Sequence, residues 1–91
     1  MYTFIVTNAD AWIPDDQVTH CQFKTKSTRC ECEFDWMNRR HHCRRCGNIF
    51  CKTHSSNRLP LFEKGKPDII QWSRVCDVCC YQLVGSSLIL S

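Results

Sequence analysis

Cysteine and histidine residues in short-spaced pairs are the part of this sequence that most clearly indicates chemistry. Three pairs are separated by two residues, and they are Cys43/Cys46, Cys51/His54 and Cys76/Cys79. A tight turn with two intervening residues points both side chains at one ion, which is the spacing of a zinc knuckle. A tetrahedral site needs four ligands, so the pattern predicts two Zn²⁺ ions and a fourth pair elsewhere in the chain.

The fourth pair begins at Cys21, but the spacing leaves its second member open. A second ligand at the usual spacing would be residue 24, which is Lys24, and the next candidates are Cys30 and Cys32. Sites closed by four protein ligands are structural, because no position remains for a catalytic water. No nucleophile–base pair stands out among the other residues, so we expect no enzymatic activity.

The composition favours metal ligation over a disulfide framework. Nine cysteines occur in 91 residues, an odd number that would leave one thiol unpaired. The first residues show neither a basic segment nor a long apolar run, so we expect no secretory signal and a reducing, cytosolic environment. A chain of this length has a marginal hydrophobic core, and metal ligation stabilises many small domains. No apolar run approaches the roughly 20 residues of a membrane span.

The remaining segments predict few regular elements. Residues 2–6 are apolar and β-branched, which indicates a short strand or an arm. Residues 55–73 contain two prolines and a glycine, so we expect a connecting loop with at most a short strand over residues 59–62. Apolar residues near helical spacing predict a short helix over residues 75–84 that ends at Gly85, with Cys80 as a packed thiol.

Three motifs resemble those of the FYVE zinc finger family. They are WIPD at residues 12–15 for WxxD, RRHHCR at residues 39–44 for the central basic motif, and RVC at residues 74–76. The resemblance assigns residues 12–84 to the zinc finger domain, residues 1–11 to an N-terminal arm and residues 85–91 to a C-terminal tail. It implies a small zinc-stabilised α+β fold with two short antiparallel β-sheets, a C-terminal helix and two cross-braced zinc sites.

The resemblance also selects the missing zinc ligand. In the family, twelve residues separate the second and third cysteines, and a phenylalanine follows four positions after the second. Cys30 meets both conditions through Phe34, and Cys32 meets neither. Cross-bracing then implies one site made of Cys21, Cys30, Cys51 and His54, and another made of Cys43, Cys46, Cys76 and Cys79. The six-residue insertion after Cys21 and the histidine in place of the sixth cysteine depart from the family pattern.

The basic residues around the third cysteine predict an anion site. An extended strand places alternate residues on one face, so we expect Arg40, His42 and Arg44 to lie exposed together. A planar guanidinium binds phosphate bidentately, and a compact array suits one phosphate-bearing head group better than a nucleic acid polymer. The formal net charge of +3 falls to about zero with seven ligating thiolates and two Zn²⁺, so anion affinity depends on where the charges lie.

The family resemblance implies that the anion is phosphatidylinositol 3-phosphate. Arg40, Arg44 and Arg74 would hold the 3-phosphate and Arg39 the 1-phosphate. Either His41 or His42, together with Asp15, would contact the ring hydroxyls. We expect no nucleic acid partner.

The family also inserts a loop before the basic motif into the bilayer. In this sequence, the loop is residues 34–38, with Trp36 and Met37 at the inserting positions and Phe34 in the core. The expected function is recruitment of a parent protein to the cytosolic face of early endosomes or of the vacuole or lysosome. A homodimer that uses apolar residues 88–90 is a further option, since two linked sites raise membrane residence.

Two other classes of protein remain as alternatives. A RING-like zinc module of the ubiquitin-ligase type also cross-braces two zinc ions, but its histidine precedes the fifth ligand, whereas the histidine is the sixth ligand in this sequence. A divergent FYVE-like module could bind a protein partner in place of a lipid. The intact basic motif favours the lipid.

Overall fold

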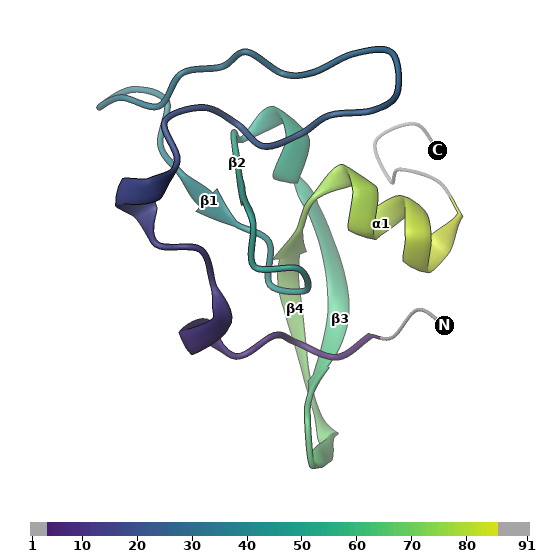
Figure 1. Ribbon diagram of the computed structural model, residues 1–91. Coiled ribbons are helices and arrows are strands. Elements are labelled where there is room, and N and C mark those ends of the chain that lie inside the picture. The colour runs from purple at the N-terminus through teal and green to yellow at the C-terminus, as the bar shows by residue number, and fades with distance from the viewer. Residues whose placement is uncertain (1–3, 86–91) are drawn as a thin grey trace.

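The computed structural model describes residues 4–85, which fold into two small antiparallel sheets and one α-helix (Figure 1). The first sheet pairs β1 (His41–His42) with β2 (Ile49–Phe50), and the second pairs β3 (Asn57–Glu63) with β4 (Lys66–Val75). The helix α1 spans Asp77–Val84, and short 3-10 turns lie at Ala9–Ala11 (η1), Asp15–Gln17 (η2) and Thr53–Ser55 (η3). The expected α+β fold is confirmed.

Parts of the two predicted terminal segments lie outside the described residues. The N-terminal arm is described only from residue 4, and the C-terminal tail only at Gly85. The apolar residues 88–90, with the dimer contact expected of them, also lie outside. In the described arm, Ile5 forms a parallel bridge to Phe62, and the Thr7 amide donates to the Arg44 carbonyl at 2.7 Å.

The β3–β4 hairpin corrects the expectation of a connecting loop over residues 55–73. Its ladder runs from Asn57 opposite Val75 to Phe62 opposite Ile70, with an irregularity between Phe62 and Glu63. Leu59 and Leu61 alternate inward and are buried, which is the period of two that a half-buried strand requires.

The hydrophobic core is small and rich in sulfur. Among the described residues, six of the twelve buried hydrophobic side chains are cysteines, and the others are Phe34, Ile49, Phe50, Leu59, Leu61 and Val75. So few large apolar side chains bury little surface, and a small domain of this kind depends on cross-links. The stability of the core therefore depends on the metal ions that its cysteines are predicted to bind.

The C-terminal helix forms where the sequence predicts it. Cys76 caps its N-terminus, and Gly85 ends it in the left-handed conformation at a φ of 81°. The Asn57 side-chain amide donates to the Asp77 carboxylate at 2.7 Å and ties β3 to the helix. Cys80 is fully buried, as expected of a packed thiol. None of the helices in residues 4–85 has the length and apolar character needed to cross a membrane.

Candidate metal centres and anion-binding surface

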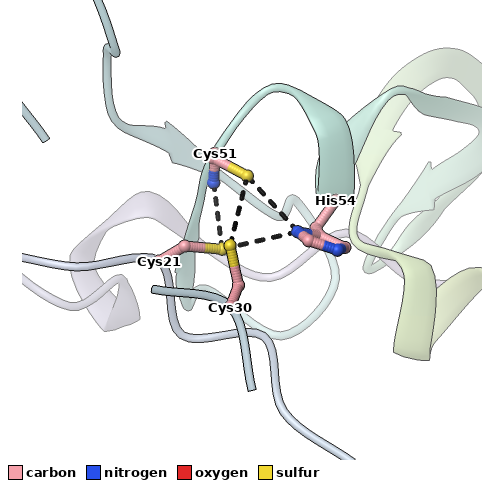
Figure 2. Close-up of side chains that lie close together, drawn as sticks. All are labelled: Cys21, Cys30, Cys51 and His54. Carbon is pink, nitrogen blue, oxygen red and sulfur yellow. Dashed lines mark hydrogen bonds between the residues drawn. The ribbon is translucent and has the colours of Figure 1, made fainter. Parts of the chain in front are cut away.

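The first metal centre brings together four residues from two distant segments (Figure 2). The ligand atoms of Cys21, Cys30, Cys51 and His54 all lie within 4.8 Å of one another. The Cys30 and Cys51 sulfurs are 3.9 Å apart, and His54 Nδ1 lies 3.3 Å from the Cys51 sulfur. The structure thus brings Cys30, and not Cys32, into this group.

Residues 21–32 fold back on themselves as a short antiparallel ribbon. This ribbon explains why a lysine can stand at position 24, where the usual spacing would place a ligand. The Cys21 amide donates to the Cys32 carbonyl at 2.9 Å, and the Cys30 amide donates to the Phe23 carbonyl at 2.9 Å. Lys24 forms a bridge with Arg29 further out along the ribbon and is exposed. The inserted residues fold back on themselves, so Cys30 returns beside Cys21 and takes the place that residue 24 would have filled.

The imidazole of His54 is oriented by an aromatic neighbour. The ring of Phe23 stacks on it with centroids 4.0 Å apart and an interplanar angle of 6°. Stacking fixes the ring plane, and Nδ1 is the nitrogen that faces the sulfurs of Cys21 and Cys51. Histidine is an ordinary zinc ligand, so the substitution of the sixth cysteine keeps four ligands and makes the site one of three cysteines and one histidine.

The second metal centre joins the basic motif to the start of the helix. The ligand atoms of Cys43, Cys46, Cys76 and Cys79 lie within 4.8 Å of one another, and the Cys46 and Cys76 sulfurs are 4.0 Å apart. Hydrogen bonds from the thiols of Cys46, Cys76 and Cys79 lower the pKa of the Cys43 thiol. Contact with Cys43 in turn raises the pKa of the Cys46 and Cys76 thiols, so the four sulfurs lie close enough to share protons, as the ligands of one metal ion do.

Both groups fit tetrahedral zinc. A Zn–S bond of about 2.3 Å places the sulfurs of one site about 3.8 Å apart. The observed separations of 3.9 and 4.0 Å agree with this value, whereas a disulfide bond would bring two sulfurs to about 2 Å. The pairing is cross-braced, since the first and third ligand pairs share one group and the second and fourth share the other. The chain therefore has two zinc sites.

Two arginines of the central motif are held by neighbouring backbone and rings. Arg40 Nε donates to the Val18 carbonyl at 3.0 Å, and its guanidinium lies 5.3 Å from the centre of the Phe34 ring. Arg44 donates to the His42 carbonyl at 2.7 Å, and its guanidinium lies 4.6 Å from the centre of the Trp12 ring. These side chains are half-buried, which corrects the expectation of a fully open face and leaves them ordered before any ligand arrives.

The N-terminal motif packs directly on the central motif. Trp12 stacks on His42 with centroids 4.8 Å apart, and His42 Nε2 lies 3.5 Å from an Asp15 carboxylate oxygen. The same nitrogen donates to the Ile13 carbonyl at 2.8 Å. Gly47 has a φ of 78°, and a Cβ there would lie 3.3 Å from Trp12, so a glycine keeps this approach close. Trp12 therefore acts as a packing residue.

His41 lies near a second set of cations. Burial lowers the pKa of His41, and the positive charges of Arg74, Arg44, Lys52 and Arg58 lower it further. The same holds for Arg74, whose pKa is lowered by burial and then by Arg58 and Arg44. Arg74 is anchored by a 2.9 Å hydrogen bond to the Ser55 carbonyl. Several positively charged side chains, among them Arg44, Arg58 and Arg74, thus lie close together where the basic motif meets β4.

These cations have no carboxylate partners within the described part of the chain. The ion pairs found there are His20–Glu33, His42–Asp15 and Lys66–Glu63. Arg39, Arg40, Arg44, Arg58 and Arg74 take part in none of them. A hollow of about 400 Å³ borders this region, and its lining combines Met37, Arg39, His41 and Lys52 with Cys30, Cys51 and His54 of the first metal centre. The hollow therefore belongs in part to the metal site, and it is the uncompensated basic surface beside it that is suited to an anion.

The loop before the basic motif is a tight turn closed by Asp35. Its carboxylate accepts from the amides of Met37 and Asn38, each at 2.8 Å, and its own amide donates to the Asn38 carbonyl at 3.0 Å. The amides of Asn38 and Met37 lower the pKa of Asp35. Trp36 is 82% exposed and Met37 69% exposed, so the turn presents two large apolar side chains to its surroundings. Phe34, just before the turn, is buried as expected.

Three residues that contribute to this region were not predicted from the sequence. Arg58 and Lys52 lie outside the three motifs, and only the hairpin register and the fold around His41 bring them close. The structural role of Asp35 depends on its hydrogen bonds to backbone amides. A run such as Asp-x-x-Asn is typical of a turn, and this signal could have been used for Asp35.

Comparison with known proteins agrees with this geometry. The model of the FYVE zinc finger family matches residues 11–85. Human RUN and FYVE domain-containing protein 1 is 49% identical over 69 residues, which are 76% of this chain and 8% of that protein. Vacuolar protein sorting-associated protein 27 of Candida albicans is 43% identical over 70 residues, which are 77% of this chain and 8% of that protein. The chain therefore spans less than a tenth of the length of these relatives.

A solved structure shares the fold. The crystal structure of the VHS and FYVE tandem domains of Hrs, a protein involved in membrane trafficking and signal transduction, matches with a TM-score of 0.61 at 34% identity. The match covers 88% of this chain and 30% of that chain. The resemblance in the three motifs thus extends to the three-dimensional arrangement.

Proposed function

The chain belongs to the FYVE zinc finger family, and we propose that it binds phosphatidylinositol 3-phosphate and attaches its parent protein to endosomal or vacuolar membranes. The domain proper would be residues 12–84. It is a binding module, with two structural zinc ions that hold its surface in shape.

The observation that carries the proposal is the uncompensated basic surface. Arg44 and Arg74 are each anchored by one hydrogen bond to a backbone carbonyl and keep further donors for a ligand. A phosphate monoester would accept from several guanidinium groups at once, and charge-assisted bonds of this kind are the strong ones. The anion would also relieve the repulsion among these cations.

Each motif has a proposed part in holding the head group. Arg40, Arg44 and Arg74 would hold the 3-phosphate, and Arg39 would reach the 1-phosphate that leads to the acyl chains. Either His41 or His42, together with Asp15, would contact the ring hydroxyls. Asp15 would accept from hydroxyls but repel a further phosphate, which supports selection of a monophosphate.

Membrane contact would come from the turn at residues 35–38. Trp36 suits the interface between head groups and acyl chains, and Met37 beside it adds flexible apolar surface. Met37 also lines the hollow with Arg39 and His41, so the inserting side chain and the head-group cations face one region. Head group and bilayer would then be engaged together.

Calorimetric titration with a soluble short-chain phosphatidylinositol 3-phosphate tests the head-group site without a membrane. We expect Arg44→Ala to weaken binding at least tenfold, because charge-assisted bonds to the phosphate are lost. Arg29→Ala is the matched control, since Arg29 is an exposed cation on the ribbon away from the motif, and its affinity should stay within twofold of the wild type. Equal affinity of Arg44→Ala and the wild type would contradict the proposal.

A further inference from the structure

Arg58 stands directly opposite Arg74 in the β3–β4 ladder. Side chains opposite each other in an antiparallel pair share one face and have Cβ atoms about 5 Å apart. Two like charges in this arrangement destabilise the sheet unless something neutralises them. In the ligand-free domain the two guanidinium groups therefore repel each other. A negatively charged group nearby would relieve this repulsion.

No carboxylate of the described chain neutralises this pair. The ladder positions next along the same face are Pro60 opposite Trp72 and Phe62 opposite Ile70, and none of these carries a charge. Of the acidic residues on or next to the hairpin, Glu63 pairs with Lys66 and Asp77 accepts from Asn57, while Asp68 lies near the turn, six residues before Arg74 on β4, and forms no ion pair within residues 4–85. The neutralising group must come from outside the described residues.

The two arginines differ in how they are held. The Arg74 guanidinium is half-buried and donates to the carbonyl and the hydroxyl of Ser55. Arg58 is exposed, and its side chain makes no hydrogen bond within residues 4–85. A guanidinium carries five donors, so Arg58 keeps its full capacity and enough freedom to close onto a ligand held by its neighbour.

Other cations surround the same place. The Arg44 amide donates to the Arg74 carbonyl at 2.9 Å, so the basic motif lies directly beside the strand that carries Arg74. Arg39, His41 and Lys52 line one hollow next to this strand pair, which gathers several cations around the Arg58–Arg74 pair. A phosphate monoester is close to a dianion at neutral pH and would be stabilised by more than one guanidinium.

We propose that Arg58 is an additional ligand of the phosphate monoester that Arg74 contacts, completing a two-arginine clamp across the hairpin. The inference rests on the proposed function and adds to it a residue outside the three motifs. The clamp is specific to the monoester, because the phosphodiester leads toward Arg39 and the inserting turn. Without the lipid, the repulsion between Arg58 and Arg74 lowers the stability of the domain. With the lipid bound, both arginines contact the phosphate and the domain becomes more stable.

Calorimetry with soluble short-chain phosphatidylinositol 3-phosphate, together with thermal unfolding of the lipid-free protein, tests the clamp. We expect Arg58→Thr, which suits a strand, to weaken binding about fivefold and to unfold at the same or a higher temperature than the wild type. Arg58→Lys keeps the charge and should recover part of the affinity. Lys66→Thr removes an exposed cation at the far end of the hairpin and should leave the affinity unchanged.

The outcomes separate this inference from the proposed function. Wild-type protein that binds no phosphoinositide overturns both. Wild-type protein that binds, with Arg58→Thr binding equally well, overturns only the clamp. Equal losses in Arg58→Thr and Lys66→Thr also overturn it, because the effect would then be one of overall charge.

Discussion

Replacing Trp36 and Met37 together by alanine removes the apolar tip of the turn that precedes the basic motif. Trp36 is 82% exposed and Met37 69% exposed, so neither side chain contributes much to the core. A buried tryptophan covers about 200 Å², and the exposed parts of both residues together come to roughly 300 Å². At about 25 cal/mol per Å², full burial in a bilayer would be worth about 8 kcal/mol.

A residue at the level of the head groups loses only part of its water, so we expect about half of this energy. A loss of about 4 kcal/mol corresponds to roughly a thousandfold weaker association with vesicles. Binding of a soluble short-chain lipid should not change, because the head-group cations remain in place. Zinc content and unfolding temperature should also stay at the wild-type values.

Vesicle sedimentation and calorimetry with the soluble lipid, run in parallel, measure the two affinities. Trp72→Ala is a matched control, because Trp72 is 70% exposed on the β3–β4 hairpin and has no proposed membrane role. It should sediment with vesicles like the wild type. Equal losses in the vesicle and soluble assays, or an equal loss in Trp72→Ala, would refute the insertion of this turn.

Three further predictions follow from the metal centres and the turn. Cys30→Ser should bind one zinc ion fewer than the wild type by native mass spectrometry, while Cys32→Ser should keep two, and the reverse result would contradict the assignment of the first centre. Asp35→Asn keeps an oxygen that accepts from the Met37 amide and should retain vesicle binding, whereas Asp35→Ala should weaken it; equal behaviour of the two variants would argue against the role of the turn. Removal of zinc by a strong chelator should unfold the domain cooperatively, and a far-ultraviolet circular dichroism spectrum that stays unchanged would contradict the small-core account.

The metal centres could be predicted largely from spacing, because a two-residue separation is a local property of the chain. Cys43 and Cys46 needed no knowledge of the fold. The partner of Cys21 was different, since a folded ribbon brings Cys30 back beside it. Spacing alone could not decide whether Cys30 or Cys32 is the zinc ligand. The resemblance to the FYVE family favoured Cys30, and the geometry of the first metal centre agrees.

The long hairpin was missed because its local signals conflict. Pro60 and Gly65 indicate a break, and proline is confined to positions where a strand needs no amide donor. Leu59 and Leu61 alternate as a strand does, but the pattern is short. Pairing with β4 decides the matter, and the strands are joined by a turn of only two residues, Lys64 and Gly65. Gly65 has a φ of 82°, so this glycine is the signal of a hairpin turn that the sequence did offer.

The sequence motifs predicted the centre of the basic surface, but they did not predict which further cations lie beside it. Arg74 belongs to a motif, whereas Arg58 joins it only through the register of the hairpin. The role of Asp35 depended in the same way on geometry, since its carboxylate bonds backbone amides that the composition does not reveal. The types of the side chains therefore predicted a basic, anion-binding surface. Which residues belong to that surface depended on contacts between parts of the chain that only the fold brings together.

The central claim is that the domain recognises a 3-phosphate on an inositol lipid. The most direct measurement compares its sedimentation with vesicles that carry equal amounts of the 3-, 4- or 5-monophosphate of phosphatidylinositol. The account predicts strong binding to the 3-phosphate and at least tenfold weaker binding to the other two, because the arginines that flank β1, Arg74 of β4 and the carboxylate of Asp15 would distinguish the position of the phosphate. Equal affinity for all three isomers would contradict it.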